Sequence, residues 1–195
     1  MQRIVYFIVI LTTLLPTGVF AQHGNDFAGI PFGSSREEVI EEVMKMGYEP
    51  FGQRAAGDHI VIPVYNFGEL PVQVDFIFNK NDKFYSFEIR TGRVERARLS
   101  KSFEAAGYMS DQFTLKYGKS SGAPTIDETS TLKENYRNMF QQWFSVKTLD
   151  VDVSIIQKDG RYFVLGTVVH RKLATEKKAR GETKTEKTTI ERPVF

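Results

Sequence analysis

The feature that most constrains the fold is a pair of alternating segments joined by an Asp-Gly turn. From Leu149 to Ile155, aliphatic residues alternate strictly with polar ones, which is the period of a strand with one buried and one solvated face. The turn reads Lys158-Asp159-Gly160-Arg161, and the return segment runs from Tyr162 to His170. Asp-Gly favours tight turns that match the twist of antiparallel strands. The sequence therefore predicts a β-hairpin here and an antiparallel sheet around it.

The first half of the chain predicts a capped helix followed by three strands. Overlapping S-x-x-E capping boxes, an apolar stripe and a terminating Gly47 predict a helix from Ser35 to Met46. Strand-like runs follow at 59–67, 72–79 and 84–91. Pro63 restricts the first run to an edge strand or a bulge. The other two runs are joined by a turn at residues 80–83 and form a predicted hairpin.

The second half of the chain has a similar order of elements. An apolar stripe that stops at Gly118 predicts a helix from Leu99 to Tyr117, and residues 119–131 form a polar loop. Residues 132–146 fit either a helix stripe or an aromatic strand, and we favour a strand from about Phe140. The predicted fold class is α+β, with an antiparallel β-sheet and helices on one face. This order also suits two tandem α-β-β-β units, at 27–92 and 93–172.

The start of the chain has the features of a secretory signal peptide at residues 1–21. Arg3 is followed by an apolar stretch from Ile4 to Leu15, a helix break and a small-residue site, which predicts cleavage between Ala21 and Gln22. We therefore expect an exported protein, periplasmic or secreted, without a transmembrane segment in the mature chain. The sequence has no cysteine, so the exported domain must be held by its core without disulfides.

Charge separates a folded body from a tail. Residues 22–170 hold 17 Lys/Arg against 20 Asp/Glu, whereas residues 171–195 hold eight against four. The tail is rich in Lys, Glu and Thr and has no apolar period, so we expect a single domain at 22–172 and a disordered charged tail at 173–195. Because the basic excess lies outside the body, no nucleic-acid surface is expected.

Residues 29–39 (Gly-Ile-Pro-Phe-Gly-Ser-Ser-Arg-Glu-Glu-Val) resemble an opening found in small exported bacterial domains. There, a Gly-x-x-x-Gly stretch with Ser or Thr caps the first helix, and antiparallel strands follow. The small outer-membrane assembly lipoproteins (BamE/SmpA-like) and the β-lactamase inhibitory proteins look like this. The resemblance implies an α+β fold and a role in protein binding, and it assigns no individual residue. This chain lacks the lipidated cysteine of the lipoproteins and the disulfides of the inhibitors.

No motif of the chain indicates catalysis, a metal or a cofactor. The histidines, His23, His59 and His170, lack paired ligand spacing. Asp150 and Asp152 share one strand face and could bind calcium or transfer protons, but a solvated strand face is the favoured interpretation. We therefore expect a protein that is not an enzyme, with no metal site and no cofactor.

The densest basic cluster of the body lies between a predicted strand and the second helix. It consists of Arg90, Arg93, Arg96, Arg98 and Lys101. The cluster could bind an anion or an acidic partner, with Arg93 and Arg96 as candidate residues. The alternative is a set of solvated charges paired with Glu88, Glu95 and Glu104.

Aromatic residues are unusually frequent, with 16 Phe and 8 Tyr. Several strands carry apolar residues on both faces, although a sheet that packs on helices needs only one apolar face. We therefore expect a patch on the far face that includes Ile77 and Phe84, with Trp143 as a further binding candidate. The leading hypothesis is a non-enzymatic protein that contacts another envelope protein through this face. The alternative is a carrier or sensor of an apolar small molecule held between helices and sheet, and a hydrolase with an unrecognised site is a third.

Overall fold

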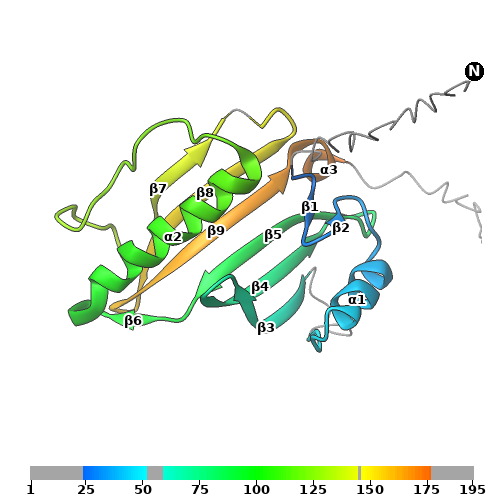
Figure 1. Cartoon of the computed structure of the whole chain (residues 1–195), viewed down its shortest axis with the longest axis horizontal. Helices are drawn as coiled ribbons and strands as arrows, with labels where there is room; N and C mark the ends of the chain where they lie inside the picture. Colours follow the sequence, from blue (N-terminus) through cyan, green and yellow to red (C-terminus); the bar gives the residue numbers. More distant parts are fainter. Residues whose placement is uncertain (1–23, 52–58, 145, 177–195) are drawn as a thin grey trace, which may run out of the picture.

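The structure is a computed structural model that describes residues 24–51, 59–144 and 146–176. Its central element is a seven-stranded antiparallel sheet (Figure 1), in which six strands follow the order β3-β4-β5-β9-β8-β7 and β6 pairs with β9. The strands are β3 (His59–Phe67), β4 (Leu70–Phe78), β5 (Phe84–Thr91), β6 (Val94–Glu95), β7 (Arg137–Trp143), β8 (Leu149–Lys158) and β9 (Arg161–His170). The fold class is therefore α+β, as the sequence predicts.

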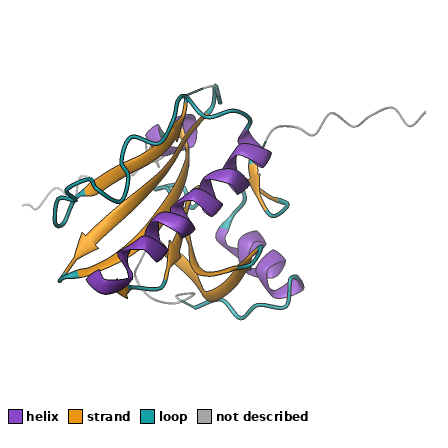
Figure 2. Cartoon of the chain, turned by 60° about the vertical axis from the view of Figure 1, so that its left-hand side comes forward, coloured by secondary structure: helices purple, strands orange, loops and turns teal. Residues whose placement is uncertain are grey.

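The helices and a small hairpin complete the body. They are α1 (Arg36–Lys45), the short 3-10 helix η1 (Arg96–Arg98), α2 (Leu99–Tyr117), α3 (Arg171–Thr175) and the hairpin of β1 (Asp26–Phe27) and β2 (Ile30–Pro31). Figure 2 shows α2 lying along one face of the sheet. The main hydrophobic core lies between α2 and the sheet, and it also contains Val39 and Val43 from α1 and Phe27 and Ile30 from the small hairpin. No helix within the described ranges is both long and apolar enough to cross a membrane.

The two α-β-β-β segments meet at the middle of the sheet. Their third strands, β5 and β9, pair antiparallel with Ser86 opposite Val169 and Arg90 opposite Leu165. Each segment therefore contributes one half of the sheet, with β3 and β7 at the two edges. The predicted edge position of β3 is confirmed, and its register shifts between Ile62 and Tyr65, around Pro63.

Three elements that the sequence predicted are present in the structure: the capped start of α1, the turn between β8 and β9, and strand β7. Ser35 Oγ accepts a hydrogen bond from the Glu38 N–H, and the Glu38 carboxylate accepts one from the Ser35 N–H, which is the predicted capping box. Asp159 and Gly160 both have positive φ, at 53° and 69°, as a two-residue hairpin turn requires. The ambiguous residues 132–146 contain β7, so the favoured strand is confirmed and begins three residues before Phe140.

The folded body extends further towards the C-terminus than residue 172, the predicted end of the domain. The short helix α3 includes Leu173, which the sequence placed in the disordered tail. Asn79 Nδ2 donates a hydrogen bond to the Leu173 carbonyl oxygen at 2.9 Å. His170 Nδ1 accepts one from the Leu173 N–H, so local capping extends the body past Lys172. The remainder of the predicted tail, residues 177–195, and the predicted signal peptide lie outside the described residues.

Candidate functional site

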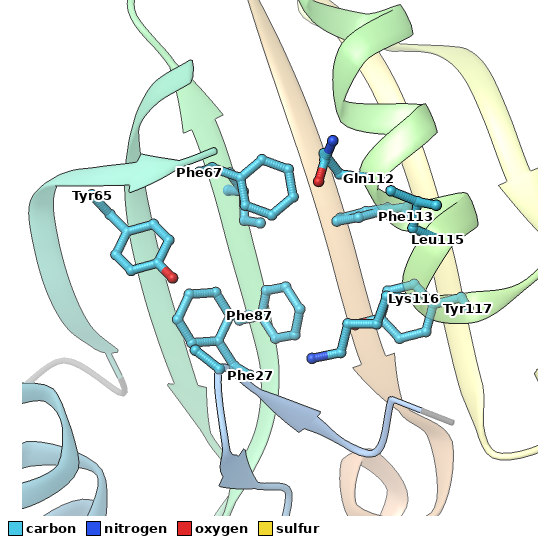
Figure 3. A pocket seen from close by; sticks show the side chains of 11 residues that line it. Phe27, Tyr65, Phe67, Phe87, Gln112, Phe113, Leu115, Lys116 and Tyr117 are labelled. Carbon is cyan, nitrogen blue, oxygen red and sulfur yellow. The ribbon is translucent and has the colours of Figure 1, made fainter. Parts of the chain in front are cut away.

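An apolar groove of about 370 Å³ opens between α2, the small hairpin and the first half of the sheet. Figure 3 shows its side chains approaching from these elements. Aromatic rings make up much of its surface: Phe27 from β1, Tyr65 and Phe67 from β3, Phe87 from β5, and Phe113 and Tyr117 from α2. This volume lies within the range of small-molecule pockets.

Ring contacts hold the walls of the groove in place. Phe27 meets Phe87 edge-on, with ring centroids 4.9 Å apart, and it meets Phe76 in the same way at 5.1 Å. Across the groove, Phe67 of β3 meets Phe113 of α2 at 6.0 Å. Aromatic pairs in these arrangements add stability beyond their buried area. The groove is therefore pre-formed, and contacts with neighbouring rings hold its lining side chains in place.

One ion pair lies at the edge of this apolar surface. Lys116 Nζ donates hydrogen bonds to the Asp26 carbonyl oxygen at 2.8 Å and to Asp26 Oδ1 at 2.9 Å. Burial by itself would raise the pKa of the Asp26 carboxyl, but hydrogen bonds from Lys116 and from the Gly29 N–H, together with the lysine charge, hold it below its usual value. The Asp26 carboxyl therefore stays ionised at neutral pH, and its contact with Lys116 joins β1 to α2.

The Tyr117 side chain carries an unsatisfied polar atom beside the groove. The residue is 2% exposed, and its hydroxyl has no hydrogen-bond partner among the described residues. Burial, reinforced by the negative charge of Asp26, raises the pKa of this phenol far above its usual range, so it stays neutral. A buried hydroxyl without a partner loses its hydration and gains nothing in return.

Replacing Tyr117 by Phe should therefore raise the free energy of unfolding, by about 1 kcal/mol. The matched control is Tyr108→Phe, because the Tyr108 oxygen accepts a hydrogen bond from the Glu69 N–H at 3.0 Å. This second change should lower stability by about 1 kcal/mol. Urea denaturation of both variants measures the two effects, and a loss of stability in Tyr117→Phe would show that the hydroxyl is satisfied in solution.

The outer face of the sheet, opposite the helices, is polar at its centre. Arg137 Nη2 lies 2.9 Å from Glu88 Oε1 and 2.9 Å from Thr167 Oγ1, and Arg137 Nη1 lies 3.8 Å from Asp152 Oδ2. Burial raises the pKa of the Asp152 carboxyl, although Arg137 and Ser154 oppose the shift. Asp152 is therefore outward-facing as predicted but largely covered, whereas Asp150 is exposed and pairs with Arg171 at 2.6 Å.

Two of the predicted binding residues lie in the core. Phe84 is fully buried, and its ring stacks on Phe32 at 4.8 Å. Trp143 is 1% exposed, and its Nε1–H donates to the Gly118 carbonyl oxygen at 3.0 Å. The expectation that Phe84 belongs to an exposed patch with Ile77 is therefore wrong, and Trp143 offers no surface to a partner.

The other three predicted residues are at the surface but not in the groove. Ile77 is partly exposed on the outer face, opposite Ser86 of β5. Arg93 and Arg96 are exposed where β5 passes into α2. The proposed pairing of this cluster with Glu88 is wrong, because Glu88 pairs with Arg137.

The histidines have different positions. His59 is exposed at the start of β3, His170 caps α3, and His23 lies outside the described residues. Among residues 24–51, 59–144 and 146–176, no group of three or more His, Cys, Asp or Glu side chains is placed to hold a metal ion.

Sequence reasoning missed the groove itself. The stripe on α2 that contains Phe113 and Tyr117 was expected to be core, and both residues are buried. Phe27 precedes the first predicted helix and showed no periodic pattern. The available signal was the excess of aromatic residues, which indicated surplus ring surface without locating it. Comparison of the chain with protein-family models, with curated proteins and with solved structures finds no match.

Proposed function

We propose that this chain is an exported, non-enzymatic binding protein whose site is the groove between α2 and the sheet, and that the groove takes an apolar small molecule. The observation that carries the proposal is the surface of the groove. Lys116 is the one charged side chain among the described residues that line it, and Asp26 already neutralises that charge. A neutral apolar ligand would gain carbon contacts there without stripping water from an unpaired charge.

The groove is also accessible. Leu115, at its rim, is 81% exposed, and Figure 3 shows the rings of Phe67, Phe87 and Phe113 around an open space. An apolar hollow with firm walls and few polar groups is the usual form of a small-molecule site. Export remains a proposal based on residues 1–21 of the sequence.

A protein partner at the outer face of the sheet stays a second proposal. It is supported by Ile77, which is partly exposed on this face opposite Ser86. It has less support than the groove, because Phe84 and Trp143, which were expected to contribute, are buried.

Filling the groove tests the leading proposal. Figure 3 shows the Gln112 amide directed from α2 towards Phe67, so Gln112→Trp should place a ring in the hollow. The probe is the neutral apolar dye phenylnaphthylamine, followed by its fluorescence on titration. We expect the wild-type chain to bind the dye and Gln112→Trp to bind it at least about tenfold more weakly, a loss of roughly 1.4 kcal/mol of carbon contacts.

The matched control places the same ring on the neighbouring, solvent-facing position of α2. Asp111 is exposed and does not line the groove, so Asp111→Trp should bind the dye as the wild type does. Equal binding by all three proteins would place the dye elsewhere, and no binding by the wild type would remove the support for an apolar ligand. Thermal unfolding of each variant confirms that it is folded.

A further inference from the structure

A recess of about 370 Å³ lies at the opposite end of α2 from the groove, where β6 meets the start of β9. Its lining contains three arginines, Arg93, Arg98 and Arg161, and one acid, Glu95. Arg93 and Arg98 flank β6 in the sequence, whereas Arg161 follows the Asp-Gly turn. These segments are brought together by the antiparallel pairing of strands β6 and β9, in which the backbone of Glu95 lies opposite that of Arg161.

The guanidinium groups of the recess have no anionic partner in the described part of the chain. Elsewhere in that part, Arg36, Arg137 and Arg171 each form an ion pair with a carboxylate. Arg93, Arg98 and Arg161 form neither an ion pair nor a side-chain hydrogen bond with any described residue. Their like charges repel one another, so an anion placed between them would be attracted by all three.

One wall of the recess is held by ring contacts. The Arg93 guanidinium lies 5.8 Å from the centroid of the Phe163 ring, and that of Arg90 lies 5.9 Å from it. Phe163 is 7% exposed and belongs to a small cluster with Ile156 and Leu165. Arg90 Nη2 also donates to Gln73 Oε1 at 2.8 Å. Contact with a buried ring limits the motion of the Arg93 guanidinium. The side chain therefore loses less conformational entropy when it binds an anion.

We propose that this recess binds a phosphate group, held by Arg93, Arg98 and Arg161. Guanidinium forks match the oxygens of phosphate in a bidentate manner. Three of them facing one carboxylate leave the recess with a net positive charge, which suits a dianion better than a single carboxylate. The group could be free phosphate or the phosphomonoester headgroup of a lipid, which present the same oxygens.

Charge-matched variants test the proposal. The probe is inorganic phosphate, titrated calorimetrically at low ionic strength. Binding should weaken by at least about tenfold in Arg93→Gln/Arg161→Gln, because charge-assisted hydrogen bonds are lost. The control is Lys80→Gln/Lys147→Gln, which changes the net charge equally at two exposed lysines outside the recess and should leave binding unchanged. Glu95→Gln should strengthen binding several-fold, because it removes the one acid of the recess.

A second arm identifies the source of the phosphate. The proteins are sedimented with phosphatidylcholine vesicles that do or do not contain phosphatidic acid. Binding that needs phosphatidic acid and falls in the arginine variant supports a lipid headgroup. Binding of inorganic phosphate without vesicle binding supports a free phosphate. No binding of either probe, or an equal loss in the arginine and lysine variants, would overturn the proposal.

Discussion

Replacing Phe84 by Ala is expected to cost about 3–5 kcal/mol of the free energy of unfolding, the range for removing a buried ring. The side chain is fully buried, and its ring lies within 6.2 Å of the ring centroids of Phe32, Phe76 and Phe78. Its backbone also joins β5 to the turn before α1, since the Phe84 carbonyl accepts from the Gly33 N–H and the Phe84 N–H donates to the Ser34 carbonyl, both at 2.8 Å. Chemical denaturation measures the loss.

The control for this prediction is Ile77→Ala on the neighbouring strand. Ile77 lies on the outer face and is partly exposed, so its loss should cost about 1 kcal/mol or less, the span of strand preferences. Equal effects of the two changes would contradict the burial of Phe84. A small effect of both would return Phe84 to the exposed patch that the sequence suggested.

A β-bulge explains why the sequence misplaced Phe84. In β5, Ser86 pairs with Ile77 and Phe84 pairs with Phe78, so the register shifts by one residue at Tyr85. Strict alternation from the inward-facing Phe87 and Ile89 would place Phe84 outward, with Ser86. The extra residue of the bulge turns Phe84 inward. Bulges depend on tertiary fit, so period-2 reasoning cannot locate them.

Elements with strong local signals were predictable. The capping box at Ser35 and the Asp-Gly turn at 159–160 are satisfied by atoms a few residues apart, and both formed as predicted. The strand order across β5 and β9 joins residues about eighty positions apart in sequence, such as Ser86 and Val169. The sequence indicated two similar halves but contained no local signal for which strands meet.

The candidate sites depend on such distant contacts. Phe27, Phe67 and Phe113 come together only when β1, β3 and α2 pack on the sheet. Arg161 joins the basic segment after β5 only through the pairing of β6 with β9. The sequence showed Arg93 and Arg98 as part of a basic cluster. It did not identify Arg161 as the third arginine of the recess, and it did not show that these arginines lack carboxylate partners among the described residues. Composition indicated surplus aromatic rings, and the sequence showed one local basic cluster. Which of these side chains come together is decided by the strand topology.

Replacing Gly166 by Val is expected to lower the free energy of unfolding by about 3 kcal/mol, at the upper end of the range for overpacking. Gly166 lies in β9 beneath α2, and a Cβ atom there would lie 2.5 Å from Met109 Sδ and 3.0 Å from Phe113 Cζ. Met109 and Phe113 are themselves buried, so neither can move into solvent. Valine favours strands more than glycine does, and local preference alone would therefore predict a gain. Thermal or urea unfolding determines the sign.

The control is Gly107→Ala in α2, the helix that packs on β9, and its effect on stability should have the opposite sign. Apart from its chain neighbours and the backbone of its own helix, a Cβ atom at Gly107 would have no heavy atom within 4 Å, and alanine is favoured over glycine in a helix by about 1 kcal/mol. This change should therefore stabilise the protein while Gly166→Val destabilises it. If Gly166→Val were also neutral or stabilising, α2 would not sit on β9 as closely as these distances require. The groove that depends on the position of Phe113 would then need a different geometry.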